Sequence, residues 1–388
     1  MTIKTDEFTS IKLNSTARRR PLSVLILLVL SFGACKDRSS GPPSITVAGS
    51  NGTAAVVPAS YADVVSRASP AVVTILSERR VRAPQQYPFQ NDPFFRYFFG
   101  PSAPQRAPES RQRGLGSGVI VNADGYIVTN HHVIDGAEDI KVVFIDNRSV
   151  EARVVGSDPP SDLAVLKISA HDLPTLPLGD SDKVRVGDIA LAIGSPLGLT
   201  QTVTAGIISA KSRATGVSDG SFEDFLQTDA PINQGNSGGA LINTNGELIG
   251  INSQILSPTG GNIGIGFAIP SNMARNIMNQ LAEKGHVRRG RLGVVIEPIT
   301  SEKANSLGLS KPQGVLVRGV EPNGPAVRAG IREGDVILAF NGTSVNDGNG
   351  LRNHVAGTPP GTQVTLTIFR DGRDMPVVVE LDEFIPKQ

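Results

Sequence analysis

The stretch QGNSGGAL, residues 234–241, places a serine between glycines, and apolar segments flank it on both sides. Such a run is either a tight turn or a place where another molecule approaches the serine closely, because glycine has no Cβ to block the approach. Serine is a weak nucleophile until a neighbouring base takes its proton, and a third group must orient that base. Ser237 is therefore a candidate nucleophile if a histidine and a carboxylate accompany it.

Histidine is scarce, with five in the chain, and two of these lie side by side in TNHHVID, residues 129–135. Asp162 follows at the start of the apolar segment LAVLKI. Each residue alone is weak evidence, because a glycine-flanked serine is often a turn, a histidine often a packing residue and an aspartate often a cap. In the order His, Asp, Ser, each beside an expected strand, they predict a catalytic triad.

The segments around these residues have the pattern of short antiparallel strands. Residues 116–134 and 239–253 each place two apolar runs around an Asp-Gly or Asn-Gly pair, which is a hairpin signal because such pairs tolerate positive φ. Further apolar segments lie at 140–145, 152–157, 163–168, 189–195 and 202–209. This spacing predicts two antiparallel barrels or a sandwich.

One clear helix is expected over Asn272–Lys284. Its apolar residues Met273, Ile277 and Leu281 recur on one face. Ser271 is expected to cap its start, and Gly285 is expected to end it.

The length, charge and residue spacing of the chain limit the number of domains and the partners and cofactors that are expected. A chain of 388 residues is long enough for two or three domains. The formal net charge is +1 and no basic stripe is present, so nucleic acid is not an expected partner. No group of His, Cys and carboxylate residues has ligand spacing, so no metal and no cofactor is expected.

The N-terminal residues 1–35 have the pattern of an export signal. Three arginines at 18–20 precede the apolar run Leu22–Phe32, which is shorter than the about 20 residues that a transmembrane helix needs. Cys35, the only cysteine, ends the sequence FGAC, which resembles the bacterial lipobox except that Phe32 stands where leucine is usual. The resemblance implies a lipid on Cys35; an uncleaved signal anchor or a plain secretory peptide is the alternative. Residues 36–60, rich in Ser, Gly, Pro and Ala, are expected to form a flexible tether.

Most of the chain from about Tyr61 resembles the HtrA/Deg family of serine proteases. The resemblance rests on TNHHVIDGA, SDLAVLKI, GSPLGLTQTVTAGIIS, LQTDAPINQGNSGGALINTNGELIGIN and GGNIGIGFAIPSN. It implies a mostly β protein with a chymotrypsin-like double β-barrel over residues 61–285, followed by one PDZ domain over residues 288–385.

The resemblance also assigns roles to the residues of the expected triad. It makes His132 the base, Asp162 the group that orients it and Ser237 the nucleophile, while the amides of Gly235 and Ser237 form the oxyanion hole. His131 stands where the family commonly has asparagine.

Two differences from the digestive relatives of this fold concern activation and specificity. Asn236 precedes the nucleophile where those relatives have an aspartate that pairs with a new N-terminus, so activation by N-terminal trimming is not expected. Pro231 and Ile232 fall at the expected base of the specificity pocket. Neither is charged, which predicts cleavage after Val, Ala or Ile rather than after Lys or Arg.

The segment GRLGVVIEPI, residues 290–299, begins the part that resembles a PDZ domain. Arg291, Leu292, Gly293 and Val294 are expected to form the loop that caps a peptide groove, where a C-terminal peptide adds as a strand. A structural PDZ domain that binds no peptide is the alternative. The groove helix is expected within residues 346–361, but its glycines make it a weak helix former.

These features imply an ATP-independent serine endopeptidase of the bacterial periplasm that degrades misfolded proteins through an acyl-enzyme. The resemblance also implies a homotrimer or a larger multiple. The aromatic segment Phe94–Phe99 is expected either to dock on a partner subunit or to pack on its own domain. Two alternatives remain open. One is a narrow regulatory protease that cleaves a membrane-anchored substrate, and the other is a holdase or scaffold without enzymatic activity.

Overall fold

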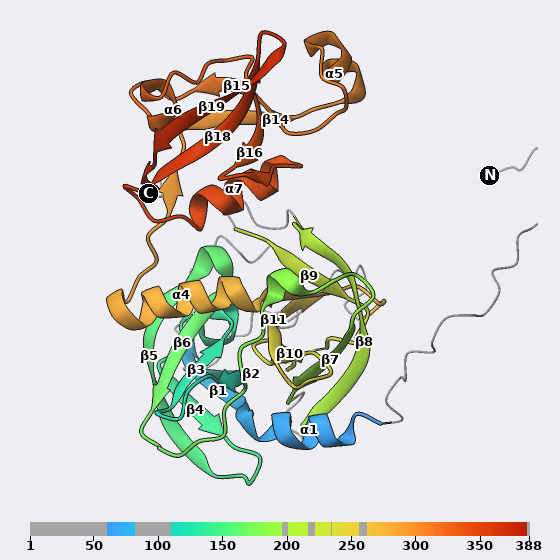
Figure 1. Ribbon diagram of the computed structural model, residues 1–388. Coiled ribbons are helices and arrows are strands. Elements are labelled where there is room, and N and C mark those ends of the chain that lie inside the picture. The colour runs from blue at the N-terminus through green and yellow to red at the C-terminus, as the bar shows by residue number, and fades with distance from the viewer. Residues whose placement is uncertain are drawn as a thin grey trace, which may run out of the picture. The chain divides into compact units, whose positions relative to one another are not determined.

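The computed structural model describes residues 60–81, 110–195, 201–215, 222–233, 235–255 and 262–385 (Figure 1). The expected export signal with Cys35, residues 36–59 of the tether and the aromatic segment Phe94–Phe99 lie outside these ranges. None of the described helices is long and apolar enough to cross a membrane.

The first barrel contains strands at the segments expected within residues 116–168 and one more strand before them. After the helix α1 (Ala62–Ala68) and a short 3-10 turn (Ser69–Ala71), six strands close in the order β1-β2-β3-β6-β5-β4. They are β1 (Val72–Val81), β2 (Ser110–Ile120), β3 (Tyr126–Thr129), β4 (Asp139–Val143), β5 (Ser149–Asp158) and β6 (Leu163–Ile168). All neighbouring strands are antiparallel.

The second barrel closes in the order β10-β11-β12-β9-β8-β7. Its strands are β7 (Ile189–Gly194), β8 (Thr202–Arg213), β9 (Phe225–Thr228), β10 (Ala240–Ile242), β11 (Leu248–Ile255) and β12 (Gly266–Pro270). A 3-10 turn (Ser181–Lys183) precedes β7. The prediction of two antiparallel barrels is confirmed.

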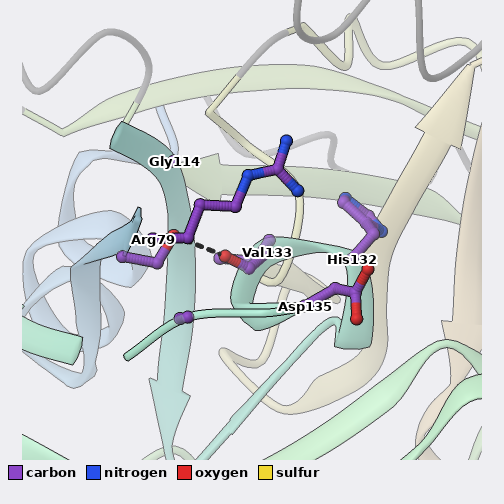
Figure 2. Close-up of a pocket in the computed structure, with 7 residues that line it drawn as sticks. Arg79, Gly114, His132, Val133 and Asp135 are labelled. Carbon is purple, nitrogen blue, oxygen red and sulfur yellow. Dashed lines mark hydrogen bonds between the residues drawn. The ribbon is translucent and has the colours of Figure 1, made fainter. Parts of the chain in front are cut away.

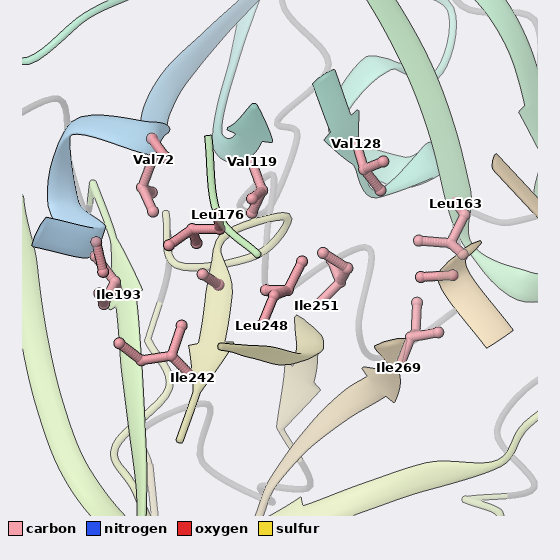
Figure 3. Close-up of a cluster of buried hydrophobic side chains, with 14 of the residues drawn as sticks. Val72, Val119, Val128, Leu163, Leu176, Ile193, Ile242, Leu248, Ile251 and Ile269 are labelled. Carbon is pink, nitrogen blue, oxygen red and sulfur yellow. The ribbon is translucent and has the colours of Figure 1, made fainter. Parts of the chain in front are cut away.

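One apolar core joins the two barrels. It combines Val72, Val119 and Leu163 of the first barrel with Ile193 and Ile251 of the second, all fully or almost fully buried (Figure 3). Because both barrels contribute to this core, a turn of the second barrel is held against strands of the first. Burial of apolar side chains is the main favourable term in folding, so this arrangement is stable.

The helix α4 (Ser271–Lys284) agrees with the expected helix at its C-terminal end. Gly285 has φ 74° and ends the helix in the left-handed conformation, and Ile277 and Leu281 are buried. The expected cap was wrong: Pro270 is the N-cap residue and makes no side-chain capping bond, and the hydroxyl of Ser181 accepts from the first-turn N–H of Asn272 at 3.1 Å. Ser271 lies inside the helix and its hydroxyl donates to the carbonyl of Gly179 at 2.8 Å.

Beyond the two barrels, the C-terminal part forms a sheet with the order β14-β15-β16-β18-β19 (Figure 1). Its strands are β14 (Val294–Pro298), β15 (Val315–Val320), β16 (Val336–Phe340), β18 (Gln363–Arg370) and β19 (Arg373–Glu380), with β17 (Thr343–Ser344) paired to β16. The short strands β13 (Gly290–Arg291) and β20 (Asp382–Glu383) pair separately. The helices are α5 (Ser301–Leu307), α6 (Pro325–Arg328) and α7 (Gly348–Ala356).

The glycine-containing segment 346–361, which the sequence marks as a weak helix former, nevertheless contains the nine-residue helix α7. The carboxylate of Asp347 accepts a hydrogen bond from the Gly350 N–H at 2.8 Å and so caps the first turn. Leu351 and Val355 are buried in the core of the sheet. Capping and tertiary packing therefore outweigh the cost of the glycines.

Candidate active site

The base and the carboxylate of the expected triad lie in direct contact. His132 belongs to the one-turn helix α3 (His131–Ile134), directly after β3, and Asp162 follows the 3-10 turn Pro159–Ser161 and precedes β6. The Nδ1 atom of His132 lies 2.8 Å and 2.9 Å from the two carboxylate oxygens of Asp162. The backbone N–H of His132 donates to the same carboxylate at 3.0 Å.

Ser237 lies in the turn before β10 and reaches the same carboxylate through one intermediate residue. Its hydroxyl donates to the carbonyl of Ser253 at 2.9 Å. The hydroxyl of Ser253 in turn donates to Asp162 at 3.0 Å. Sequence reasoning missed Ser253, although a polar residue inside the apolar segment LIGINSQI, residues 248–255, is a signal that could have found it.

Asp162 is held in an unusual backbone conformation and kept ionised. Its φ is 56°, a left-handed value that is uncommon for residues other than glycine. Its carbonyl accepts from the His131 N–H at 3.1 Å and from Nδ2 of Asn130 at 2.9 Å. Burial alone would raise the pKa of Asp162, but the adjacent His132 and hydrogen bonds from His132 and Ser253 outweigh it, so the pKa lies below its ordinary value of 3.8.

The turn that carries Ser237 is hydrogen-bonded to the first barrel through Ser117 on β2. Ser117 Oγ donates to the carbonyl of Gly235 at 2.6 Å, and the Ser117 N–H donates to the carbonyl of Ser237 at 2.8 Å. Gly238 has φ 81°, and a Cβ there would lie 2.1 Å from the Ser117 carbonyl oxygen. Glycine is therefore required where this turn approaches β2.

The two expected oxyanion-hole amides share this turn. Gly235 has φ 95°, which favours glycine. Among the described residues, the N–H groups of Gly235 and Ser237 donate to no other group. They are thus available to a ligand oxygen.

The two expected pocket residues differ in exposure. Pro231 is exposed and its carbonyl accepts from Thr204 Oγ1 at 2.8 Å. Ile232 is 2% exposed and packs in the core of the second barrel with Leu226 and Ala268. Neither side chain carries charge.

A small pocket next to His132 lies between β1, β2 and α3 (Figure 2). Its lining comprises Ser77, Arg79, Gly114, His132, Val133, Asp135 and Ala137. Across the described residues, no cluster of three or more His, Cys, Asp or Glu side chains has the arrangement of a metal site.

The expected capping loop of the PDZ part connects β13 to β14. Arg291 ends β13 and pairs with Glu321 at 2.7 Å. Leu292 is buried, and Gly293 has φ 74°. Val294 begins β14, which is an edge strand of its sheet. An edge strand offers backbone groups to an added peptide strand.

Comparison with known proteins finds matches to two families in the chain. Residues 116–251 match the family described as a trypsin-like peptidase domain, and residues 290–381 match the PDZ domain. The chain is 43% identical over 381 residues to the periplasmic serine endoprotease DegP of Escherichia coli strain K12, which covers 92% of this chain and 79% of that protein. It is 45% identical over 331 residues to a probable periplasmic serine protease do/HhoA-like of Haemophilus influenzae, with 83% and 71% covered.

Solved structures give the same result. The HtrA-type protease AlgW with tripeptide is 43% identical, with a TM-score of 0.68 and coverage of 84% of this chain and 98% of that chain. The serine endoprotease from Yersinia pestis is 40% identical, with a TM-score of 0.55 and coverage of 85% and 100%. The chain is therefore a serine endopeptidase and belongs to the HtrA/DegP family, with a trypsin-like peptidase domain followed by one PDZ domain.

Proposed function

We propose that the chain degrades misfolded or damaged proteins in the bacterial periplasm without ATP, through an acyl-enzyme formed on Ser237. The observation that carries this proposal is the contact chain from Ser237 through Ser253 to the Asp162 carboxylate, which also holds Nδ1 of His132. The relatives named periplasmic endoproteases support the location.

Each residue of the site has a defined step in this mechanism. Ser237 Oγ rotates from the Ser253 carbonyl toward His132, gives its proton to the imidazole and attacks the scissile carbonyl. Asp162 stabilises the imidazolium, which then protonates the leaving amine. The amides of Gly235 and Ser237 hold the oxyanion, and removal of one such donor typically costs about 10²–10³ in turnover. A water molecule activated by His132 releases the acyl group.

The uncharged residues Pro231 and Ile232 support a preference for Val, Ala or Ile before the cut bond. Digestion of an unfolded substrate followed by mass spectrometry of the new C-termini tests this preference. A majority of Lys or Arg at those termini would contradict it.

The PDZ part binds C-terminal peptides as an added strand along β14. Gly293 and its neighbours Arg291, Leu292 and Val294 hold the terminal carboxylate with backbone amides. Binding of a peptide with a free carboxyl terminus, compared with the same peptide amidated, tests this role by fluorescence anisotropy. Equal affinity of the two peptides would exclude carboxylate recognition.

The working form is a homotrimer that a lipid on Cys35 anchors to a membrane. Sedimentation equilibrium of the purified chain is expected to give three times the chain mass. A monomer at all concentrations would exclude the trimer.

The decisive experiment compares the wild type with Ser237→Ala on denatured casein, with and without candidate C-terminal peptides. We expect digestion by the wild type and a loss of more than about 10³-fold in the variant, because the nucleophile is absent. Equal loss of intact casein in both proteins would refute the assignment of Ser237. Digestion that starts only when a peptide is added would instead indicate a narrow regulatory protease, and suppressed aggregation without labelling of Ser237 by a fluorophosphonate would indicate a holdase.

A further inference from the structure

His131, the neighbour of the expected base, makes contacts that the reaction does not use. Its Nδ1 atom lies 2.7 Å from the hydroxyl of Ser157. Its Nε2 atom lies 3.6 Å from a carboxylate oxygen of Asp135, which follows α3. Its own backbone N–H donates to the Asp162 carbonyl at 3.1 Å. The residue therefore contacts three separate points around the candidate active site.

These contacts join the two loops that carry His132 and Asp162. Ser157 is the penultimate residue of β5, and β5 leads through the 3-10 turn Pro159–Ser161 directly to Asp162. His131 is the first residue of α3, which holds His132. The imidazole of His131 thus connects the start of α3, which carries His132, to the end of β5, which leads to Asp162.

Neither α3 nor the turn at Asp162 is expected to keep its conformation without contacts from other parts of the chain. The helix α3 has only four residues, and one turn of helix is too short to be stable without outside contacts. Asp162 adopts a left-handed φ of 56°, which surrounding contacts must hold. The distance between the imidazole of His132 and the carboxylate therefore depends on the contacts that fix α3, both the backbone bonds of His131 and His132 to Asp162 and the side-chain bond of His131 to β5.

The two side-chain contacts of His131 differ in strength. In the tautomer with a proton on Nε2, the Ser157 hydroxyl donates to Nδ1 at hydrogen-bond distance, while the Nε2–H faces Asp135 at a distance too long for a hydrogen bond. The Asp135 side chain is 58% exposed, so water screens this second contact. The bond to Ser157 is therefore the stronger of the two side-chain contacts of His131, and it adds a link to β5 to the bond that the Ser77 hydroxyl donates to the Val133 carbonyl of α3 at 2.8 Å.

We propose that His131 is a positioning residue for peptide hydrolysis: by bonding Ser157 it holds α3 against β5 and so sets the geometry between His132 and Asp162. The proposal rests on the triad proposed above. Small displacements of catalytic groups reduce turnover more than they reduce substrate binding, because binding does not require the alignment of base and carboxylate.

The test measures kcat and KM of the full-length chain on denatured fluorescein-labelled casein. His131→Ala is expected to lower kcat about three- to tenfold and to leave KM within about twofold, the scale of one lost hydrogen bond. His131→Asn places an amide near the position of Nδ1, so it keeps the bond to Ser157 and is expected to recover most of the lost kcat. Ser157→Ala is expected to lower kcat as His131→Ala does, and the double variant to be no worse than either, because both remove the same bond.

Three controls make the result decisive. His171→Ala removes an exposed histidine outside the site and is expected to match the wild type. Thermal unfolding of each variant shows whether it is folded at the assay temperature. Ser237→Ala tests the triad itself: casein turnover in that variant would overturn the proposed function rather than the role of His131.

Two results would overturn the positioning role while the triad stands. One is an unchanged kcat in a folded His131→Ala variant. The other is multiplicative losses in the double variant, which would show that His131 and Ser157 act independently.

Discussion

Ser253 makes the two contacts that connect Ser237 to the carboxylate of Asp162. Ser253→Ala removes the hydroxyl that donates to Asp162 but leaves the backbone carbonyl that accepts from Ser237. We expect kcat to fall about tenfold, because a hydrogen bond to a charged group contributes about 1.5–3 kcal/mol and only part of it bears on the reaction. Steady-state kinetics on casein measure this, with the exposed Ser149→Ala as the matched control. A kcat equal to that of the control would show that Ser253 has no part in the reaction.

The same substitution has a signed effect on acid stability. A carboxyl group whose pKa is lowered in the folded state stabilises the fold above its unfolded pKa, and this contribution is lost as the pH falls through the folded pKa. The bond from Ser253 is one cause that lowers the pKa of Asp162. Ser253→Ala should therefore lower the free energy of unfolding at neutral pH, and this deficit relative to the wild type should shrink as the pH falls below the unfolded pKa of the carboxyl group, because the variant has less pKa-linked stability to lose. Identical acid transitions would contradict this account.

Alanine substitutions at Gly238 and Gly246 distinguish the stability cost of a positive φ from the cost of a steric clash. Their φ values are 81° and 84°, but a Cβ on Gly238 would meet the Ser117 carbonyl at 2.1 Å, whereas the nearest atom at Gly246 is 3.7 Å away. Gly246→Ala should cost about 1 kcal/mol of unfolding free energy. Gly238→Ala should cost about 3 kcal/mol or more, because β2 must also move. Denaturant unfolding measures both, and equal losses would show that the turn does not need its close approach to β2.

At the scale of elements, α7 depends on a single cap. The sequence of this segment favours helix weakly, and the Asp347 carboxylate satisfies the first-turn N–H of Gly350. Asp347→Ala should cost about 1 kcal/mol locally, which is about a fivefold faster amide hydrogen exchange over residues 348–356. Exchange monitored by mass spectrometry measures this, with the exposed Asp374→Ala as control. Equal exchange in the two variants would mean that the helix does not need this cap and is held by its tertiary contacts, which include the packing of Leu351 and Val355.

In the helix α4, a local sequence signal determines the C-terminal end, whereas a tertiary contact determines the role of Ser271. Gly285 could be predicted as the end because a left-handed residue is needed there whatever the surroundings. Ser271 could not be predicted correctly, because its hydroxyl bonds to Gly179, which is 92 residues away in the sequence. A capping preference is a local property, and a distant acceptor outweighed it.

At the scale of the whole molecule, the prediction concerns attachment to a membrane. Cys35→Ala should abolish metabolic labelling with palmitate and move the protein from the membrane fraction to the soluble periplasmic fraction, because stable anchoring needs the acyl chains. Fractionation of cells with labelling of the wild type and the variant measures this. An unlabelled wild type that is still exported would indicate a plain secretory peptide instead.

The sequence by itself determined the strand pattern, the turns, the end of α4 and the chain order of His132, Asp162 and Ser237. These depend on hydrophobic period, on residues that tolerate positive φ and on residue type, all of which are local. Whether Ser237 and Asp162 share one site was a matter of distance in space, and only the packing of two barrels on one core decided it.

The same packing created contacts that no local pattern encodes. Ser253 reaches Asp162 across 91 residues of sequence, and Ser117 reaches Gly235 across 118. His131 reaches Ser157 across 26 residues, between a helix and a strand that the sequence does not pair. Each of these bonds joins segments whose mutual position is set by the buried core rather than by their own residues, and for that physical reason only the tertiary structure decided them.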